Sequence, residues 1–528
     1  MSNKLPPSIF NDVLGPVMRG PSSSHTAAAV RIGRIIRQFF DSNRLHITVE
    51  FDADGSLAST YNSQGTDIGL AAGLLGMDPA SEGLAKSLSL AEKEGICLNF
   101  KVSNFKTNHP NTFRIEAGEE GGCNFNLIFI STGGGMFELI ELNGIPLSIR
   151  GDYHENLFLF NLNGSAEPET LVRKMALLFP EHEAISFADK NGSCLINLKT
   201  RQPCLENIAG RLSPDYKFTS VIRLKPELPV LSRRNIELPF HNAAGLLKEA
   251  ESSSRQIHDL ALDYECSRGG LNEKKVYCLT AGILTVMKRS IETGLSGTNY
   301  QDRILGPQAH KMLSYNGMVP GGKEVKNIIA LISAVMETKS SMGVIAAAPT
   351  AGACACLPGI LIASSKANSI NDIQLSKALL TAGLVGVLIA HKSTFAAEEC
   401  GCQAECGSAS AMSAAALVQL AGGSAKQALA AASMALQNLL GMICDPVANR
   451  VEVPCLGKNI LAGMNALAAA NMALSGFDQV IPFDETLMAF DQVGRMLPSE
   501  LRCTGKGGLS ITDSSRELQK RLDNRAFL

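Results

Sequence analysis

At 528 residues the chain is too long for a single hydrophobic core, and its length predicts three or four folded units. The formal net charge is only −2 and there is no basic block, so the sequence gives no indication of a nucleic-acid partner. Hydrophobic residues make up 45% of the chain, which also holds 48 glycines and no tryptophan. This composition is typical of a compact globular protein whose elements pack through small residues.

The first ten residues, MSNKLPPSIF, lack the apolar region of a secretory signal. The alanine-rich helices expected near the C-terminus are interrupted by Gly, Asn and Gln, so none offers a bare span of about twenty apolar residues. We therefore expect a cytoplasmic protein without a membrane partner. Fourteen cysteines in such a chain favour metal binding or catalysis over disulfide bonds.

The first unit, expected over residues 8–150, is an α+β domain that opens with GPVMRGPSSSHTAAAVRIGRIIRQF. A Gly-Pro pair breaks the chain, residues 22–26 form a polar turn, and an amphipathic helix begins at Ala27. Three hydroxyl groups and His25 at a helix N-terminus form a candidate anion site, because free backbone N–H groups and the helix dipole both favour negative charge. The simpler alternative is that a serine only caps the helix.

Alternating apolar residues predict several strands in the same unit. The strands lie in HITVEFDADG, ICLNFKV, TFRIEAG, FNLIFISTGGG and PLSIRG, and TDIGLAAGLLG is predicted to form a helix after the first of them. STGGGMF is a glycine turn after a strand, where the backbone can approach a ligand closely. His109 precedes a proline in NHPNTF, which favours an extended or turn conformation. A histidine in such a turn is most often a surface residue.

A second unit is expected over residues 152–225, where strands and helices follow in the order βαββαβ. That order is typical of ferredoxin-like domains, and it resembles the ACT-type units that bind amino acids in metabolic enzymes. The first turn, GSAEPE, lacks the usual Asp-x-Pro-Gly type of entry, so we expect a packing or dimerisation role and, with it, a homodimer. A proline-bearing linker with little periodicity follows at 226–240.

Residues 241–528 are predicted to be almost wholly helical, an all-α domain. Small residues dominate its middle, so the helices can pack closely. Gly- or Pro-bearing breaks interrupt the helices at 348–359, 400–407, 444–455 and 502–512. Loops of this kind among buried helices are where a site in a helical core is usually built.

Five cysteines gather in two of these breaks. Cys400, Cys402 and Cys406 lie on a Gly-rich turn, and Cys444 and Cys455 bracket a loop whose prolines exclude a continuous helix. The leading interpretation is an iron–sulfur cluster held by three cysteines, with one iron left open for a substrate. The alternative is that these cysteines are core residues, since free cysteine is one of the most buried residue types.

Several motifs at the two ends of the chain occur together in one known family. They are GPSSSHT and HPNTFR near the N-terminus, and APTAGAC, GCQAE and CDPVANRVEVPC in the helical part. With this combination the chain resembles the iron–sulfur-dependent L-serine dehydratases, in a single-chain form that joins a β-type and an α-type unit. The resemblance covers about residues 10–140 and 240–512, and the ACT-like unit falls outside it.

The resemblance implies a lyase that deaminates L-serine to pyruvate and ammonia by Lewis-acid-assisted β-elimination of water. It implies a [4Fe–4S] cluster with one open iron, held by Cys402, Cys444 and Cys455. The catalytic base for the α-proton of this small amino-acid substrate is expected to be His109 or His25, because imidazole titrates near neutral pH. The residues expected to bind the substrate are Ser22, Ser24, Thr26, Thr350 and Gly352.

Three departures from the family pattern leave alternatives open. Gln64, in YNSQGTD, stands where family members commonly have a histidine, and it cannot act as a base. The chain ends in RAFL rather than in the cysteine that can cap the open iron in several members, and Cys503 is the nearest substitute by position. Cys400 and Cys406 are extra thiols beside the expected ligand. The alternatives are a lyase for another β-substituted amino acid, such as threonine, cysteine or one with a larger leaving group, or a non-enzymatic amino-acid sensor with a structural cluster. A pyridoxal-phosphate lyase is a weaker alternative, with Lys506 in TGKGG as its candidate lysine.

Overall fold

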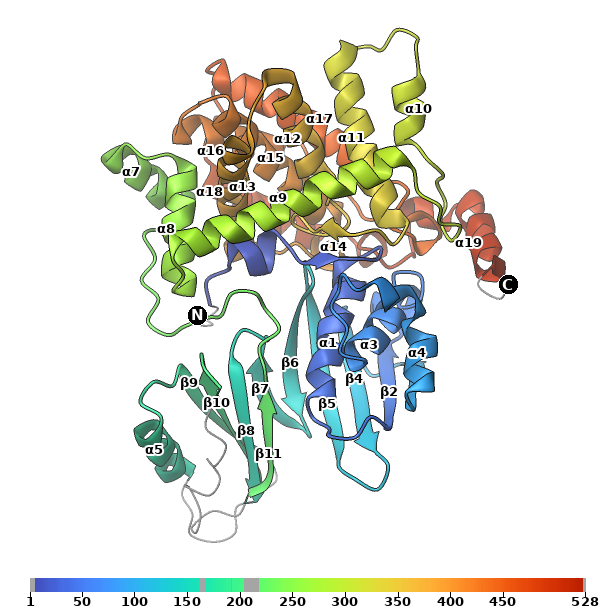
Figure 1. Ribbon diagram of the computed structural model, residues 1–528, viewed down its shortest axis with the longest axis vertical. Helices are drawn as coiled ribbons and strands as arrows, with labels where there is room; N and C mark the ends of the chain where they lie inside the picture. The colour runs from blue at the N-terminus through green and yellow to red at the C-terminus, as the bar shows by residue number, and fades with distance from the viewer. Residues whose placement is uncertain (1–4, 162–167, 191, 204–217, 526–528) are drawn as a thin grey trace.

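The computed structural model of the protein describes residues 5–161, 168–190, 192–203 and 218–525. Figure 1 shows two β-sheets with their helices at one end and a large helical part at the other. The multidomain arrangement expected from the sequence, with a mixed α/β N-terminal region and a helical C-terminal region, is therefore confirmed.

The N-terminal unit is built around a six-stranded sheet with the order β3-β2-β4-β5-β6-β7. Within this sheet β2 and β3 pair in parallel, and the other neighbours are antiparallel. Apolar residues alternate along the strands and form a core in which Phe51, Phe113, Phe129 and Phe137 are fully buried. The elements are η1 (Ile9–Val13), β1 (Val17–Met18), η2 (Ser23–Ala27), α1 (Ala28–Arg37), β2 (Leu45–Asp52), α2 (Leu57–Thr60), α3 (Thr66–Leu74), η3 (Glu82–Lys86), α4 (Ser87–Lys93), β3 (Ile96–Ser103), β4 (Thr112–Glu119), β5 (Asn124–Gly133), β6 (Met136–Leu142) and β7 (Ile145–Ile149).

Helices α1 and α3 pack closely against each other beside this sheet (Figure 1). Glycines lie at the contact between them, where a side chain would clash with the other helix. An ideal Cβ at Gly73 would lie 2.0 Å from the carbonyl oxygen of Val30. An ideal Cβ at Gly33 would lie 2.5 Å from the carbonyl oxygen of Leu70. Because α1 follows the serine turn and α3 follows the Gln64 turn, this backbone-to-backbone packing fixes the two turns relative to each other.

The middle unit is a four-stranded antiparallel sheet with the order β11-β8-β10-β9. This strand order agrees with the succession of strands predicted for the unit. The second predicted helix, CLENIAGRLS, lies outside the described residues. The described elements are β8 (His154–Asn161), α5 (Pro168–Leu178), β9 (Ala184–Lys190), β10 (Ser193–Thr200) and β11 (Phe218–Leu224).

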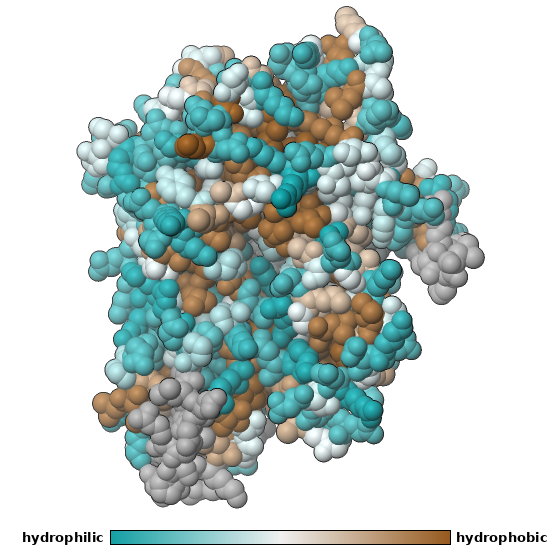
Figure 2. Space-filling view, in the orientation of Figure 1, coloured by the Kyte–Doolittle hydropathy of each residue, from teal (hydrophilic) through white to brown (hydrophobic). Residues whose placement is uncertain are grey.

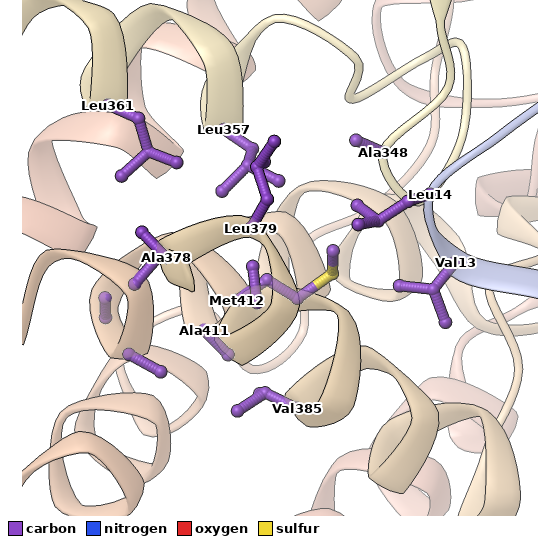
Figure 3. Packing of buried hydrophobic residues seen from close by; sticks show 14 of the residues in the cluster. Val13, Leu14, Ala348, Leu357, Leu361, Ala378, Leu379, Val385, Ala411 and Met412 are labelled. Atoms are coloured by element: carbon purple, nitrogen blue, oxygen red, sulfur yellow. The ribbon is translucent and has the colours of Figure 1, made fainter. Parts of the chain in front are cut away.

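The helical unit is organised around two largely buried helices, α13 and α15. Figure 3 shows how Leu357 and Leu361 of α12, Leu379 of α13 and Met412 of α15 approach one another. The elements are α7 (Ala243–Ser253), α8 (Ile257–Gly269), α9 (Glu273–Ser296), α10 (Ala309–Ser314), α11 (Gly322–Ser340), β12 (Ile345–Ala346), α12 (Cys356–Asn368), α13 (Asp372–Lys392), α14 (Ala397–Cys402), η4 (Gln403–Gly407), α15 (Ser408–Leu420), α16 (Ala425–Gln437), η5 (Val447–Asn449), α17 (Cys455–Leu474), α18 (Phe483–Met496), η6 (Ser499–Leu501), η7 (Gly508–Ile511) and α19 (Asp513–Arg525).

The N-terminal segment with η1 and β1 packs into the hydrophobic core of the helical unit. Val13 points into that core in Figure 3, and an ideal Cβ at Gly386 of α13 would lie 2.2 Å from Val13 Cγ1. The backbone N–H of Ile9 donates to the buried carboxylate of Glu265 at 2.8 Å. β1 also pairs with β12, with Val17 opposite Ala346. These contacts hold the first unit on the helical unit.

Helix α13 is the most apolar long helix among the described residues. Among the described helices α13 is long and apolar enough to cross a membrane by length and composition, although polar residues interrupt its sequence. However, 78% of its most apolar stretch is buried inside the protein, as expected for a core helix that is hydrophobic all round. Figure 2 shows the visible face of the molecule largely covered by hydrophilic side chains, with hydrophobic groups between them.

Candidate active site

A small cavity lies where the N-terminal unit meets the loops of the helical unit, and we call it the thiol cavity. Its walls come from stretches far apart in the sequence. They are formed by Ser22, Ser24, Gln64, Gly352, Ala397, Glu398, Glu405, Cys444, Pro446, Val451, Cys455 and Cys503.

Cys444, Cys455 and Cys503 line the cavity, and Cys402 lies directly beside it, with its Sγ within 4.8 Å of that of Cys444. Gly401 has a φ of +70°, and an ideal Cβ there would lie 2.7 Å from the carbonyl oxygen of Met442, so that a larger residue would push the turn away. Cys402 follows this turn at the end of α14. Cys455 is the first residue of α17, directly after Pro454. The backbone of Cys444 bridges that of Arg502 in a parallel pairing.

The thiols lie close enough to share one metal group. The Sγ atoms of Cys402 and Cys444 and a carboxylate oxygen of Glu405 all lie within 4.8 Å of one another. Hydrogen bonds with the Cys402 and Cys503 thiols, together with burial, raise the pKa of Cys444 well above its ordinary value. Burial and the Cys402 thiol also raise the pKa of Cys455. Metal binding releases such protons, and a set of buried soft thiolates fits an iron–sulfur group rather than a hard cation such as Mg²⁺.

Cys503, named from the sequence as the nearest substitute for a capping cysteine, is a fourth thiol at this site. Its backbone N–H donates to the carbonyl oxygen of Cys444 at 3.0 Å, and it has a φ of +61°, which is unusual for a residue other than glycine. The side-chain amide of Gln64 donates to Cys503 Sγ at 3.6 Å. Gln64 therefore faces the cavity as a hydrogen-bond donor to a thiol.

The two extra thiols of the glycine turn differ in their distance from the expected ligands: Cys400 packs on another helix, whereas Cys406 is near enough to Cys402 and Cys455 for those thiols to help raise its pKa. Cys400 packs against Gly494 of α18, where an ideal Cβ would lie 2.9 Å from its Sγ. Cys406 packs with Cys356 and Ala462 in a separate small hydrophobic cluster. Neither residue lines the thiol cavity. The burial of Cys400 against α18 agrees with a packing role.

The serine turn contributes both to the cavity and to its support. Ser22 and Ser24 line the cavity. Thr26 lies behind it and donates its hydroxyl to the backbone carbonyl of Gln64 at 2.8 Å. Ser131, from the predicted glycine turn STGGGMF, donates to the carbonyl oxygen of Ser24 at 2.8 Å. The structure thus brings the serine turn, the Gln64 turn and the glycine turn together.

His25 is fully buried in this support and is neutral. Burial lowers the pKa of its imidazole to about 3. Thr60 donates its hydroxyl to the carbonyl oxygen of Ser56 at 2.6 Å, so its oxygen accepts the hydrogen bond of 2.8 Å that joins it to His25 Nε2. Nε2 therefore carries the imidazole proton, and Nδ1 accepts from the hydroxyl of Ser22 at 3.0 Å.

The turn APTAGAC supplies a further wall. Thr350 donates its hydroxyl to Glu405 Oε1 at 2.6 Å, and Gly352 lines the cavity itself. An ideal Cβ at Gly352 would lie 2.5 Å from Glu405 Oε1, so glycine is needed for this close approach. Both residues of the motif therefore meet Glu405.

His109 does not line the thiol cavity. It borders a larger neighbouring cleft, and its Nε2 lies 3.6 Å from Glu399 Oε1. Its Nδ1 accepts from the backbone N–H of Asn111 at 3.2 Å. The catalytic role predicted for this imidazole thus stays a prediction, and Glu399 lines the same cleft beside it.

Four charged residues near the thiols were missed by the sequence analysis. Glu398 and Glu405 line the cavity; Glu405 is the last residue of the motif GCQAE, which was used only for its cysteine, and Glu398 has no sequence signal beyond the acidic residues before the CGC turn. Lys458 donates to Asp445 at 2.9 Å, and although burial opposes its charge, the Cys402 and Cys444 thiols help to raise its pKa. Lys339 is fully buried and donates to the carbonyl oxygen of Val451. Neither lysine lies in a recognisable motif, because their place beside the thiols arises only from helix packing.

Both of the larger units match family models. Residues 12–139 match the serine dehydratase beta chain, and residues 246–510 match the serine dehydratase alpha chain. Together with the thiol cavity between them, these matches define a two-unit enzyme class in one polypeptide. The chain belongs to the serine dehydratase family, in its fused single-chain form.

Individual relatives agree with this assignment. The chain is 35% identical to a probable L-serine dehydratase alpha chain of Bacillus subtilis, over 54% of this chain and 95% of the relative. It is 43% identical to a probable L-serine dehydratase beta chain of the same organism, over 29% of this chain and 68% of the relative. It is also similar to an L-serine dehydratase of Haemophilus influenzae, with 25% identity over 93% of this chain and 96% of the relative.

Proposed function

We propose that this protein is a lyase that deaminates L-serine to pyruvate and ammonia. The observation that supports this most is the meeting of the cysteine thiols with Ser22 and Ser24 in one cavity, since these residues come from the two units that match the family. The walls carry hydroxyl, amide and carboxylate groups in a small space, which suits a small polar amino acid. The relatives' names do not favour another β-substituted amino acid or a sensor.

The proposed cofactor is a [4Fe–4S] cluster held by Cys402, Cys444 and Cys455. When bound, the cluster supplies an open iron that acts as a Lewis acid toward the substrate hydroxyl, a contribution of several kcal/mol. Cys503 is the thiol that would cap that iron when substrate is absent, because it is hydrogen-bonded to Cys444. Lys458 supplies positive charge beside the thiolates.

The substrate carboxylate is proposed to bind at the serine turn, where the Ser22 and Ser24 hydroxyls reach the cavity. Thr26 and Thr350 are proposed to act indirectly, because their hydroxyl groups hold Gln64 and Glu405 in place. Gly352 has no side chain, which leaves space at the cavity wall next to Glu405. His25, neutral and fixed between two hydroxyl groups, orients Ser22.

The test is a comparison of anaerobically reconstituted variants. The wild-type protein should show the broad brown absorbance of an iron–sulfur cluster and should form pyruvate from L-serine faster than it deaminates L-threonine or L-cysteine. Cys444→Ser should lose the absorbance, whereas Cys400→Ser, which removes a buried thiol that packs against Gly494 of α18, should keep it. Full iron and sulfide in Cys444→Ser would contradict the ligand assignment. A cluster-loaded wild-type protein without L-serine turnover would contradict the activity.

We further propose the domain boundaries given in the sequence analysis, with an ACT-like middle unit over 152–225, a homodimer and a cytoplasmic location. The strand order of the middle sheet supports the ACT-like assignment. Light scattering of the purified protein tests the dimer, and a mass equal to one chain would contradict it. Binding of amino acids to a variant whose thiol cavity is blocked would test for a second ligand site in the middle unit.

A further inference from the structure

Glu398 is a buried acidic side chain on the wall of the thiol cavity for which no role was predicted. Its Oε2 atom has no hydrogen-bond partner among the residues that the structure describes. The side-chain amide of Asn111 lies beside this carboxyl and acts to lower its pKa, although neither polar atom of the amide makes a regular hydrogen bond in the described part of the chain. Buried polar atoms are almost always hydrogen-bonded, so an orphaned carboxyl oxygen on a cavity wall indicates a place for a polar ligand.

The other oxygen of Glu398 faces the support of the serine turn. Oε1 lies 3.6 Å from Nδ1 of His25, and that nitrogen carries a lone pair because the proton is on Nε2. An ionised carboxylate is unfavourable against this lone pair, whereas a protonated carboxyl is not. Burial and the neighbouring Glu405 act in the same direction and raise the pKa of Glu398 to about 7. The group can therefore hold or release a proton near neutral pH.

We propose that Glu398 is the catalytic base, and that its Oε2 atom takes the α-proton of the bound amino acid. This inference rests on the proposed function of the thiol cavity and deepens it. A carboxyl that changes its protonation state near the working pH is suited to accept a proton in one step and return it in a later one.

The proton and the electrons balance with this assignment. The Cα–H bond of L-serine breaks, and its proton moves to Glu398 Oε2. The electron pair of that bond forms the second bond between Cα and Cβ, while the Cβ–O bond breaks and the oxygen leaves as hydroxide. When Glu398 returns the proton to the hydroxide, the products are 2-aminoacrylate and water. The enamine then tautomerises and is hydrolysed to pyruvate and ammonia, without an oxidant or a reductant.

Other titratable groups are less well placed for this proton. Both imidazole nitrogens of His25 already have partners, and His109 borders the neighbouring cleft. Glu405 accepts from the hydroxyl of Thr350 at 2.6 Å and lies 3.9 Å from Cys402 Sγ. Glu398 alone combines a place on the cavity wall with an oxygen that has no partner in the described part of the chain.

The experiment compares Glu398→Gln and Glu398→Ala with the wild-type holoenzyme. Glu398→Gln keeps the shape of the side chain and should lower kcat for L-serine by about 10²–10⁴-fold, while iron content and brown absorbance stay at wild-type values. Glu398→Ala should be equally slow, and added formate should restore part of its activity, because a small carboxylate can enter the vacated space. Glu155→Gln is the matched control, since Glu155 is a buried carboxyl of the middle unit with one unpartnered oxygen in the described chain, and its turnover should be normal.

Three results would overturn the assignment. They are more than a tenth of wild-type turnover in Glu398→Gln, loss of the cluster in that variant, and failure of formate to restore Glu398→Ala. Normal turnover in the variants with an active wild type would overturn only the role of Glu398. A cluster-loaded wild type that does not turn over L-serine would instead overturn the proposed function, so the two failures are distinguishable.

Discussion

Glu398 should make the stability of the protein depend on pH in a way that Glu398→Gln removes. Burial raises the pKa of this carboxyl from 4.5 to about 7 in the folded protein. At about 1.4 kcal/mol for each pKa unit, ionising it in place costs roughly 3 kcal/mol more than ionising it in the unfolded chain. Because the folded state binds the extra proton, the free energy of unfolding of the wild type falls as pH rises through the interval between these two values.

The amide of Glu398→Gln cannot ionise, so the variant lacks this loss. Relative to the wild type, Glu398→Gln should therefore gain up to about 3 kcal/mol in free energy of unfolding between pH 4.5 and pH 7, with no further gain above that range. The buried, neutral His25 lowers the free energy of unfolding at low pH, because the unfolded chain can protonate this imidazole more easily. His25 is present in both proteins, so its contribution largely cancels in the difference between them. Urea denaturation of cluster-free protein at pH 5, 6, 7 and 8 measures the effect. The same difference in stability at all four pH values would refute the argument.

Three other predictions concern packing and the site. Gly73→Ala should lower the free energy of unfolding by about 1–3 kcal/mol, because its Cβ would lie 2.0 Å from a backbone oxygen of α1. The control Gly282→Ala adds a Cβ in open space on α9 and should stabilise the protein slightly. Equal melting temperatures of the two variants would contradict this prediction. Cys503→Ser should lose activity in air faster than the wild type, and an unchanged half-life would argue against capping by this thiol. His109→Ala should keep turnover within about tenfold if Glu398 is the base, whereas a loss of several orders of magnitude with an intact cluster would restore the role predicted for His109 from the sequence.

The elements with strong local periodicity were predictable from the sequence. The strand Leu45–Asp52 alternates buried and more exposed side chains as its pattern indicates, because period two is a property of the backbone itself. The serine turn, the cysteine breaks and the strands of the middle unit were located for the same kind of reason, since Gly, Pro and Ser set local conformation. The apolar α13 was harder to judge, because the sequence of a fully buried helix and that of a membrane span look alike.

The composition of the cavity was less predictable because it depends on contacts between distant residues. Cys402, Cys444 and Cys455 could be nominated from motifs, but the approach of Cys503 depends on the pairing of its backbone with Cys444. His109 shares a motif with Asn111, yet the imidazole turns toward the larger cleft. The spacing of residues along the sequence does not tell whether a side chain lines a cavity or lies in the layer behind it.

The docking of β1 on β12 has a consequence for how the enzyme behaves on dilution. The serine turn and the cysteine loops belong to one polypeptide, so completing the cavity is a unimolecular step with a fixed effective concentration. Two separate subunits would drift apart at low concentration according to mass action, and the fraction of complete sites would fall with them. In this fused chain the two halves are translated in equal number and stay within reach of each other. Activity per molecule should therefore be the same at nanomolar as at micromolar protein.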